Sequence, residues 1–133
     1  MPDTNLKDFY GRYIAALNDR DFETVRTLIA DAVHVNGTAY KRENVIASLE
    51  GIVDAVPDFR WTVQDLVTEN NRIAARLHDT GTPAKPFLGH EATGATLNII
   101  EYGSYRVENG LFVGMWFLID AATAGEQLRS QAT

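Results

Sequence analysis

Two neighbouring side chains, Arg76 and His78, offer the clearest chemistry in this sequence. Residues 73–78 alternate between apolar and polar side chains, which is typical of a half-buried strand, so Arg76 and His78 share one face. If that face is concave, an imidazole that titrates near neutral pH and a guanidinium that holds a carboxylate or an enolate enter a pocket together. The alternative is an exposed strand face, or a structural pair between Arg76 and a carboxylate. The pattern leaves both interpretations open.

Asp120 is the third candidate, because it ends a segment, 111–119, that carries no charge. In a pocket this carboxylate could act as a general base or could orient Arg76 or His78. Aspartate is also a preferred N-cap, and two alanines follow it as the start of a short helix. We therefore expect a helix cap at Asp120, a role that is compatible with a catalytic one.

A pocket in this chain would be lined mainly by apolar and aromatic side chains. Most aromatic residues at strand spacing pack in a core, and a minority lines a cavity. Asn36 precedes a glycine, which favours a turn, but it also lies near the point where a cone-shaped sheet would open. The expected ligand-binding residues are Tyr13, Leu17, Asn36, Trp61, Tyr102, Met115, Phe117 and Ile119.

No metal site and no cofactor are predicted. His34, His78 and His90 do not lie at ligand spacing on one element, and the sequence has no cysteine. Glycine-rich phosphate loops and nucleophile elbows are also absent from the sequence.

Size and charge restrict the class of protein. A chain of 133 residues fits a single domain, 1–133, and 45% hydrophobic with 23% charged residues is ordinary for a globular protein. The net charge of -6 comes without a basic patch, which argues against binding to nucleic acid or to an anionic membrane. No signal-peptide pattern and no apolar run of membrane-spanning length occur, so a cytoplasmic location is the default expectation.

The hydrophobic period changes at Pro57, and this change predicts the fold class. Before Pro57, apolar residues recur every three or four positions, with Thr4 or Asn5 as the first N-cap. The predicted helices are 6–17, 22–29 and 45–56, with a brief strand at 33–36. After Pro57, the predicted strands are 59–67, 73–78, 94–105 and 111–120, with a loop at 80–94 and a short helix at 121–129. Helices first and an antiparallel meander afterwards indicate an α+β fold.

Short motifs along the chain follow the order and spacing of one family. They are Arg76, Gly81-Thr82, Phe87-Leu88-Gly89, Ala92-Thr93-Gly94, Tyr105-Arg106, Gly110-Leu111-Phe112, Trp116, Asp120 and Gln127-Leu128. Together they resemble the SnoaL-like polyketide cyclases, over about residues 9–128. That family shares its fold with nuclear transport factor two and the ketosteroid isomerases. The resemblance implies helices packed on a strongly curved antiparallel sheet, a cone-shaped cystatin-like barrel with an interior pocket.

Three positions depart from the aldol cyclases of this family. Phe117 stands where those enzymes carry the acid/base aspartate, and Gly103 stands where a histidine assists it. Pro83 replaces the histidine of a Gly-Thr-His motif, whereas Asp120 and Asn36 match family residues. The resemblance therefore implies the fold but does not support the aldol cyclase mechanism.

Two other enzyme types share the fold. Limonene-epoxide hydrolases use an Asp-Arg-Asp arrangement, for which Arg76 and Asp120 supply two parts and Asp65 or Asp79 the third. Ketosteroid isomerases need a tyrosine and two carboxylates deep in the pocket, and the apolar closing strand argues against that arrangement.

The leading hypothesis is a cofactor-independent SnoaL-like protein that binds a small apolar or aromatic molecule and performs acid–base chemistry: cyclisation, isomerisation or hydration. Arg76 and His78 would supply polarity, and Asp120 would lie at the rim. The alternative is a non-catalytic binding or dimerisation module, which Phe117 and Pro83 favour.

A homodimer is expected under either hypothesis. Trp116 and Leu118 share one face of the closing strand, whereas Met115, Phe117 and Ile119 share the other. Only one of these faces can meet the helices, so the second would leave an apolar patch for a partner.

Overall fold

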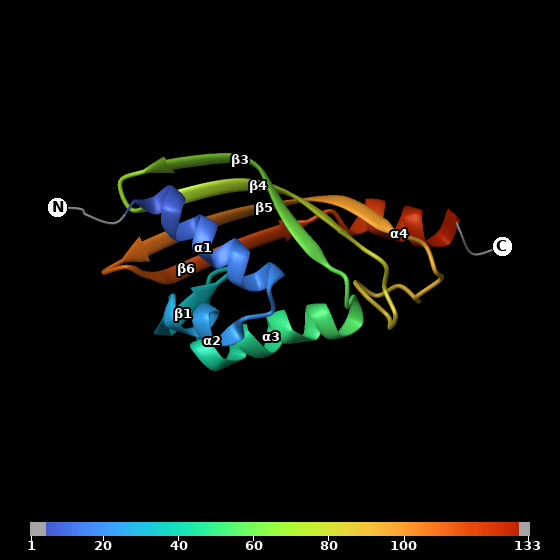
Figure 1. The fold of residues 1–133 in the computed structure, drawn as a ribbon, viewed down its shortest axis with the longest axis horizontal. Helices are drawn as coiled ribbons and strands as arrows, with labels where there is room; N and C mark the ends of the chain where they lie inside the picture. Colours follow the sequence, from blue (N-terminus) through green and yellow to red (C-terminus); the bar gives the residue numbers. More distant parts are fainter. Residues whose placement is uncertain (1–4, 131–133) are drawn as a thin grey trace.

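The computed structural model describes residues 5–130, which form four helices and a six-stranded sheet (Figure 1). Residues 1–4 and 131–133 of the predicted domain lie outside the described residues. The elements in chain order are α1 (Leu6–Asn18), α2 (Phe22–Thr27), β1 (Ile29–Val35), β2 (Thr38–Lys41), α3 (Arg42–Ala55), β3 (Arg60–Glu69), β4 (Arg72–Gly81), β5 (Leu97–Glu108), β6 (Leu111–Ile119) and α4 (Ala121–Ser130).

The sheet has the strand order β2-β1-β6-β5-β4-β3. Neighbouring strands are antiparallel except β1, which runs parallel to β6. The predicted α+β fold, with helices packed on a curved sheet, is confirmed. The sheet is mixed rather than wholly antiparallel, because β1 pairs in parallel with β6, the last strand of the antiparallel meander β3–β6.

Helix α1 lies across the concave face of the sheet and supplies much of the core (Figure 1). The side chain of Asn5 caps it by accepting hydrogen bonds from the backbone N–H groups of Lys7 and Asp8, and the other predicted cap, Thr4, lies outside the described residues. The predicted apolar stripe is buried: Leu6, Phe9, Tyr10, Tyr13, Ile14 and Leu17. Its burial against the sheet holds a short helix that would be marginal alone.

The edge of the sheet differs from the prediction. The segment predicted as the end of a second helix begins strand β1 at Ile29, which lies opposite Phe112 of β6. Residues 38–41 form a short edge strand that the sequence did not indicate, since its four side chains are all exposed. Apolar pairs such as Leu28 and Ile29 fit a helix and a strand equally well, and the contact with β6 decides between them.

Strands β4 and β5 place the side chains that matter for the interior. On β4 the buried face carries Ile73, Ala75, Leu77 and Asp79. In the register of β4 and β5, Leu77 lies opposite Glu101 and Asp79 lies opposite Ile99. Asp79 and Glu101 are therefore diagonal neighbours on one face, within reach of each other.

Within residues 5–130, none of the helices is both long enough and apolar enough to cross a bilayer.

Candidate functional site

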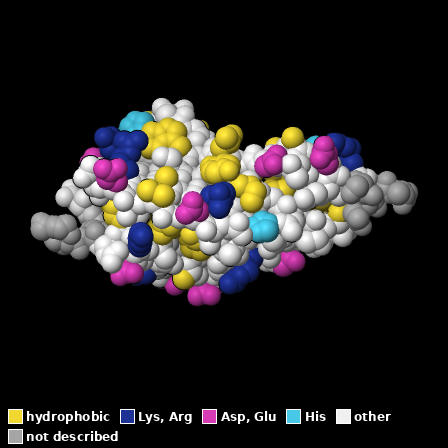
Figure 2. Space-filling view, turned by 90° about the horizontal axis from the view of Figure 1, so that it is seen from above, with side chains coloured by type: hydrophobic (Ala, Val, Ile, Leu, Met, Phe, Trp, Pro, Cys, Tyr) yellow, Lys and Arg dark blue, Asp and Glu magenta, His cyan; other side chains and the backbone are white. Residues whose placement is uncertain are grey.

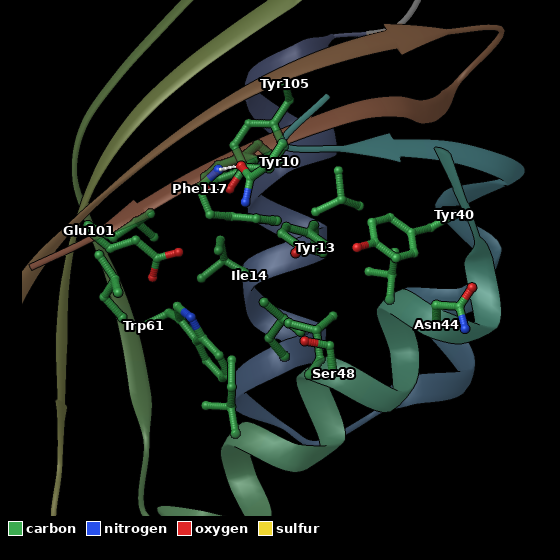
Figure 3. A pocket seen from close by; sticks show the side chains of 18 of the residues that line it. Tyr10, Tyr13, Ile14, Tyr40, Asn44, Ser48, Trp61, Glu101, Tyr105 and Phe117 are labelled. Atoms are coloured by element: carbon green, nitrogen blue, oxygen red, sulfur yellow. Dashed lines mark hydrogen bonds between the residues drawn. The ribbon is translucent and has the colours of Figure 1, made fainter. Parts of the chain in front are cut away.

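A cavity of about 530 Å³ lies between the concave face of the sheet and helices α1 and α3 (Figure 3). This volume is in the range that holds a small organic molecule. Its wall is largely apolar, and its mouth carries polar side chains from β2 and α3. The lining residues include Tyr13, Ile14 and Leu17 of α1, Val45, Leu49 and Ile52 of α3, Trp61, Leu77, Glu101, Tyr105, Phe117 and Ile119 of the sheet, and Asn36, Tyr40, Asn44 and Ser48 at the mouth.

Three tyrosines meet at the sheet end of this cavity. The hydroxyls of Tyr10 and Tyr105 share a hydrogen bond of 3.0 Å, and the ring centroids of Tyr10 and Tyr13 lie 5.8 Å apart. Burial raises the pKa of Tyr10, Tyr13 and Tyr105 above the ordinary value for tyrosine. The hydroxyls therefore stay protonated at neutral pH and can donate hydrogen bonds.

Gly103 makes the position of Tyr105 possible. A Cβ atom at Gly103 would meet the Tyr105 hydroxyl and would lie 2.8 Å from ring atoms Cε1 and Cζ. The Tyr105 ring thus leans along β5 over Gly103, in space that a side chain at this position would fill. The absence of a side chain at position 103 is what allows the contact between Tyr105 and Tyr10.

Two carboxyl groups, Asp79 and Glu101, lie together beside the tyrosines. Glu101 lines the cavity, and its carboxyl group points into it (Figure 3). Asp79, its diagonal neighbour on β4, is fully buried, and no N–H or hydroxyl of the described residues donates to either of its oxygens. The neighbouring group that acts on the ionisation of Asp79 is the Glu101 carboxyl, and no basic side chain of residues 5–130 donates a hydrogen bond to Asp79.

Burial sets the ionisation of this pair. Loss of water, together with the neighbouring Glu101 carboxyl, raises the pKa of Asp79 to about 10. Burial also raises the pKa of Glu101, and the hydrogen bond from Asp79 acts in the opposite direction. At neutral pH the pair therefore keeps at least one proton that two exposed carboxyl groups would lose.

The prediction that Arg76 and His78 face the pocket is wrong. On β4 the buried side chains, including Ile73, Ala75 and Leu77, point to the concave face. The side chains between them alternate to the opposite face and therefore point outward. Arg76 is exposed on the outer face beside Tyr102, and His78 is half-buried there.

His78 has a structural setting on that outer face. Gln64 Nε2 donates to His78 Nδ1 over 3.3 Å, and His78 Nε2 donates to Asn98 Oδ1. Gln127 of α4 in turn donates to the Asn98 carbonyl over 2.9 Å and accepts from its N–H over 2.8 Å. This chain of contacts ties α4 to strands β3, β4 and β5.

Of the predicted ligand-binding residues, two do not line the cavity. Tyr102 is 54% exposed on the outer face, because it alternates out of phase with Glu101 and Gly103. Met115 is fully buried in the core and does not reach the cavity wall. The other predicted residues do line it: Tyr13, Leu17, Asn36, Trp61, Phe117 and Ile119. Their contact with a ligand stays a prediction.

Asp120 and Asn36 both serve local structure. Asp120 caps α4, since its carboxylate accepts from the Thr123 N–H over 3.0 Å and from the Thr123 hydroxyl over 2.7 Å. These bonds lower the pKa of Asp120, and the residue does not line the cavity. Asn36 has a left-handed backbone (φ 51°) in the turn between β1 and β2, and its side chain accepts from the Phe117 N–H over 2.9 Å.

Sequence reasoning missed Glu101 as a site residue and gave Asp79 only a secondary role. A usable signal was present: both acids lie in the apolar phase of their strands, Asp79 after Leu77 and Glu101 between Ile99 and Gly103. A charge in a buried phase is rarely tolerated without a function or a partner. In the sequence, the apolar closing strand argued against a tyrosine with two carboxyl groups deep in the pocket. That argument does not hold, because the two acids lie on β4 and β5 and not on the closing strand β6.

No three His, Asp or Glu side chains of residues 5–130 are placed to hold a metal ion.

Comparisons with known proteins agree with this fold. A crystal structure of a SnoaL-like polyketide cyclase from Agrobacterium tumefaciens is similar over 95% of this chain and 99% of its own, with 27% identity and a TM-score of 0.88. IdmH from Streptomyces antibioticus shares 26% identity over 96% of this chain and 98% of its own, with a TM-score of 0.80. The comparison with curated proteins finds no match. The family model for SnoaL-like polyketide cyclase matches residues 7–128. The chain therefore belongs to the SnoaL-like polyketide cyclase family.

Proposed function

We propose that the cavity binds a small, largely apolar molecule and catalyses proton transfer on it, with the Glu101 carboxylate as general base. The observation that carries this proposal is the Asp79–Glu101 pair, which reaches the cavity through Glu101 and has no counter-cation among the described residues. Buried acids with strongly perturbed pKa values in a cavity are typical of functional sites.

The chemistry follows from the positions of the donors and the base. Glu101 takes a proton from a carbon next to a ligand carbonyl, and the electron pair of that C–H bond moves to give an enolate. The Tyr13 hydroxyl, which points into the same cavity (Figure 3), donates a hydrogen bond to the oxygen that gains negative charge. Return of the proton from Glu101 to another carbon completes an isomerisation. Alternatively, the enolate carbon attacks a second carbonyl of the ligand, the π electrons of that carbonyl move to its oxygen, and the resulting alkoxide takes the proton from Glu101, which gives a cyclisation.

Asp79 supports this step without touching the ligand. Asp79 is fully buried and does not line the cavity, and in this proposal it holds the proton of the pair while Glu101 acts as the carboxylate. Because burial raises the pKa of Glu101 as well, its carboxylate is a stronger base than an exposed glutamate.

Deuterium exchange tests the proposal without knowledge of the natural substrate. In D2O, wild-type protein should speed deuterium incorporation next to the carbonyl of 2-tetralone, an uncharged ketone, as followed by proton NMR. Glu101→Gln should reduce the enzyme-dependent rate by at least about 10²-fold, because it removes the base. Asp65→Asn, which removes an acid on the outer face, is the matched control and should retain the rate.

His78→Gln separates this proposal from the sequence-based hypothesis. If Glu101 is the base, His78→Gln retains exchange, since His78 faces away from the cavity. Loss of exchange in His78→Gln with retention in Glu101→Gln would reverse the assignment.

A second candidate function is binding without catalysis. It is favoured by Phe117 on the cavity wall and by Pro83, at positions where the resemblance implies an acid and a histidine. Saturable binding of 2-tetralone with no exchange above the buffer rate would support this candidate against the first.

We also propose a homodimer through the outer face of the sheet. Val67, Tyr102, Trp116 and Leu118 are exposed on that face and form what we call the outer patch. Tyr102 lies opposite Leu118 in the strand register, so the patch is continuous across β5 and β6. Figure 2 shows hydrophobic side chains gathered over the strands among separate acidic and basic groups.

A further inference from the structure

The turn that follows helix α1 holds one wall of the cavity in place. Trp61 forms part of that wall (Figure 3), and its side chain is only 4% exposed. It lies at the start of β3, the last strand at one edge of the sheet, where backbone groups need partners from outside the sheet. The Asn18 side chain supplies both partners, since it accepts from the Trp61 N–H and donates to the Trp61 carbonyl, each over 2.9 Å. Asn18 therefore takes the place of a neighbouring strand at this residue.

Arg20 holds the same part of β3 from a second direction. Its Nη2 atom donates to the carbonyls of Pro57 and Phe59, over 2.8 and 2.7 Å. Its Nη1 atom donates to the Leu17 carbonyl over 3.1 Å. The guanidinium also lies over the Trp61 ring, with Cζ 5.9 Å from the ring centroid, which is within the range of a cation–π contact. One side chain thus ties the segment that leads into Trp61 to the end of α1.

The backbone of Arg20 is left-handed, with φ 60°, and this conformation is strained for a residue that has a Cβ atom. Glycine would adopt it without strain. Strained residues persist where the surrounding contacts fix them, and they gather at functional sites. At position 20 those contacts come from the guanidinium, which glycine lacks, and they converge on the strand that carries Trp61.

Asn18 and Arg20 themselves do not line the cavity, whereas their neighbours Leu17 and Trp61 do. The two side chains therefore act on a ligand only through Trp61. We propose that Asn18 and Arg20 are positioning residues, which fix the place of the Trp61 ring and, through it, the size of the ligand that the cavity accepts. The inference rests on the proposed function and adds to it two residues outside the cavity.

Isothermal titration calorimetry with two uncharged ketones, 2-tetralone and the bulkier 6-methoxy-2-tetralone, tests this inference. Partial unfolding weakens both affinities by the same factor, so the ratio of the two dissociation constants reports the shape of the site alone. Asn18→Leu keeps the shape of the side chain but makes neither hydrogen bond. It should shift the ratio about tenfold in favour of the larger ketone, because a wall that can move tolerates the added group.

A second variant and a matched control accompany this measurement. Arg20→Met removes the guanidinium and should shift the ratio in the same direction, and it decides the question if Asn18→Leu does not fold. The control is Arg12→Met on α1. The Arg12 guanidinium lies over the Phe9 ring at 5.7 Å, and neither of these residues lines the cavity. Arg12→Met should therefore keep the wild-type ratio.

Tryptophan fluorescence reports the ring itself. Since the sequence has two tryptophans, Trp116→Phe leaves Trp61 as the only one. In this background, Asn18→Leu should shift the emission of Trp61 to longer wavelength and increase its quenching by acrylamide, whereas Arg12→Met should do neither. Saturable binding with the wild-type ratio in both Asn18→Leu and Arg20→Met overturns this inference alone. Absence of saturable binding of either ketone to the wild type overturns the proposed binding function and this inference with it.

Discussion

At the scale of single residues, Asp79 is a buried acid whose carboxyl oxygens have no hydrogen-bond partner among the described residues. A carboxyl with no donor and no cation must stay protonated, because its ionised form would be buried without compensation. A protein that only needed a stable core would do better with an apolar residue here. Its presence next to the cavity-facing Glu101 is therefore the strongest residue-level argument for chemistry in the cavity.

The first prediction concerns the pH dependence of stability. The folded protein keeps the Asp79 proton up to a pKa of about 10, whereas the unfolded chain loses it near its ordinary pKa of about 4. Between these values the folded state binds more protons, so the free energy of unfolding should fall as pH rises, by at most about 1.4 kcal/mol per pH unit for this group. Asp79→Asn should flatten that fall.

Urea unfolding at pH 5, 7 and 9 would measure this effect. Asp65→Asn removes an exposed acid and should keep the wild-type slope. An Asp79→Asn profile parallel to wild type would mean that Asp79 ionises normally in the folded protein.

The second prediction concerns the space beneath Tyr105. Gly103→Ala should displace the Tyr105 ring and separate its hydroxyl from Tyr10, at a cost of about 1–3 kcal/mol in the free energy of unfolding. The matched control is Gly51→Ala on α3, where an added Cβ meets nothing within 4 Å and helix propensity should add up to about 1 kcal/mol of stability. Equal stability of wild type and Gly103→Ala in thermal unfolding would show that Tyr105 does not depend on Gly103.

The residues of the site were only partly predictable from the sequence. Alternation along β4 correctly paired Arg76 with His78 on one face, but alternation does not say which face is inside. The apolar set Ile73, Ala75 and Leu77 settles that point, and it carries Asp79 inward with it. The tyrosine contact between Tyr10 and Tyr105 joins positions 95 residues apart, which no local pattern indicates.

At the scale of elements, Asp120 at the start of helix α4 has two proposed roles: it could belong to the site, or it could cap the helix. Asp120 provides the first-turn bonds of α4, while the contacts of Gln127 with Asn98 hold the helix to the sheet. Asp120 is exposed, and it follows the apolar strand β6 because it caps the helix that begins there.

The third prediction separates these two roles. Asp120→Ala should lower the free energy of unfolding by about 1 kcal/mol, because the cap is lost. Asp120→Asn should restore most of it, since the amide oxygen can still accept from the Thr123 N–H. Ligand affinity and exchange rate should be unchanged in both variants; a loss of exchange with normal stability would instead assign Asp120 to the chemistry.

Helices and strands with a long periodic pattern of apolar residues were predictable from the sequence. Short strands that form only by pairing with a neighbouring strand were not. The stripe of α1 and the long hairpin β5–β6 have enough residues for the period to be clear, and Asn109 and Gly110 both take the positive φ that the turn needs. Strand β2 has four exposed residues and exists because β1 offers it an edge. Its existence depends on a neighbour rather than on its own sequence.

At the scale of the whole molecule, the two faces of the sheet have different tasks. The concave face is covered by α1 and encloses the cavity, and the outer face carries the outer patch without a helix over it. Leu118 is 71% exposed and Val67 60%, values that are unusual for apolar side chains clustered on a monomer. A copy of the same chain, related by a two-fold axis, can cover such a patch with an identical one.

The fourth prediction is that the protein is a dimer at micromolar concentration. Light scattering should give twice the chain mass of 14.7 kDa. Leu118→Glu should give a monomer, because two like charges would be buried against each other at the centre of the interface. Ala47→Glu, an equal change at an exposed position of α3, should remain dimeric. Because Leu118 does not line the cavity, monomeric Leu118→Glu should bind 2-tetralone as wild type does. A monomeric wild type would leave the outer patch uncovered and would refute the proposed dimer.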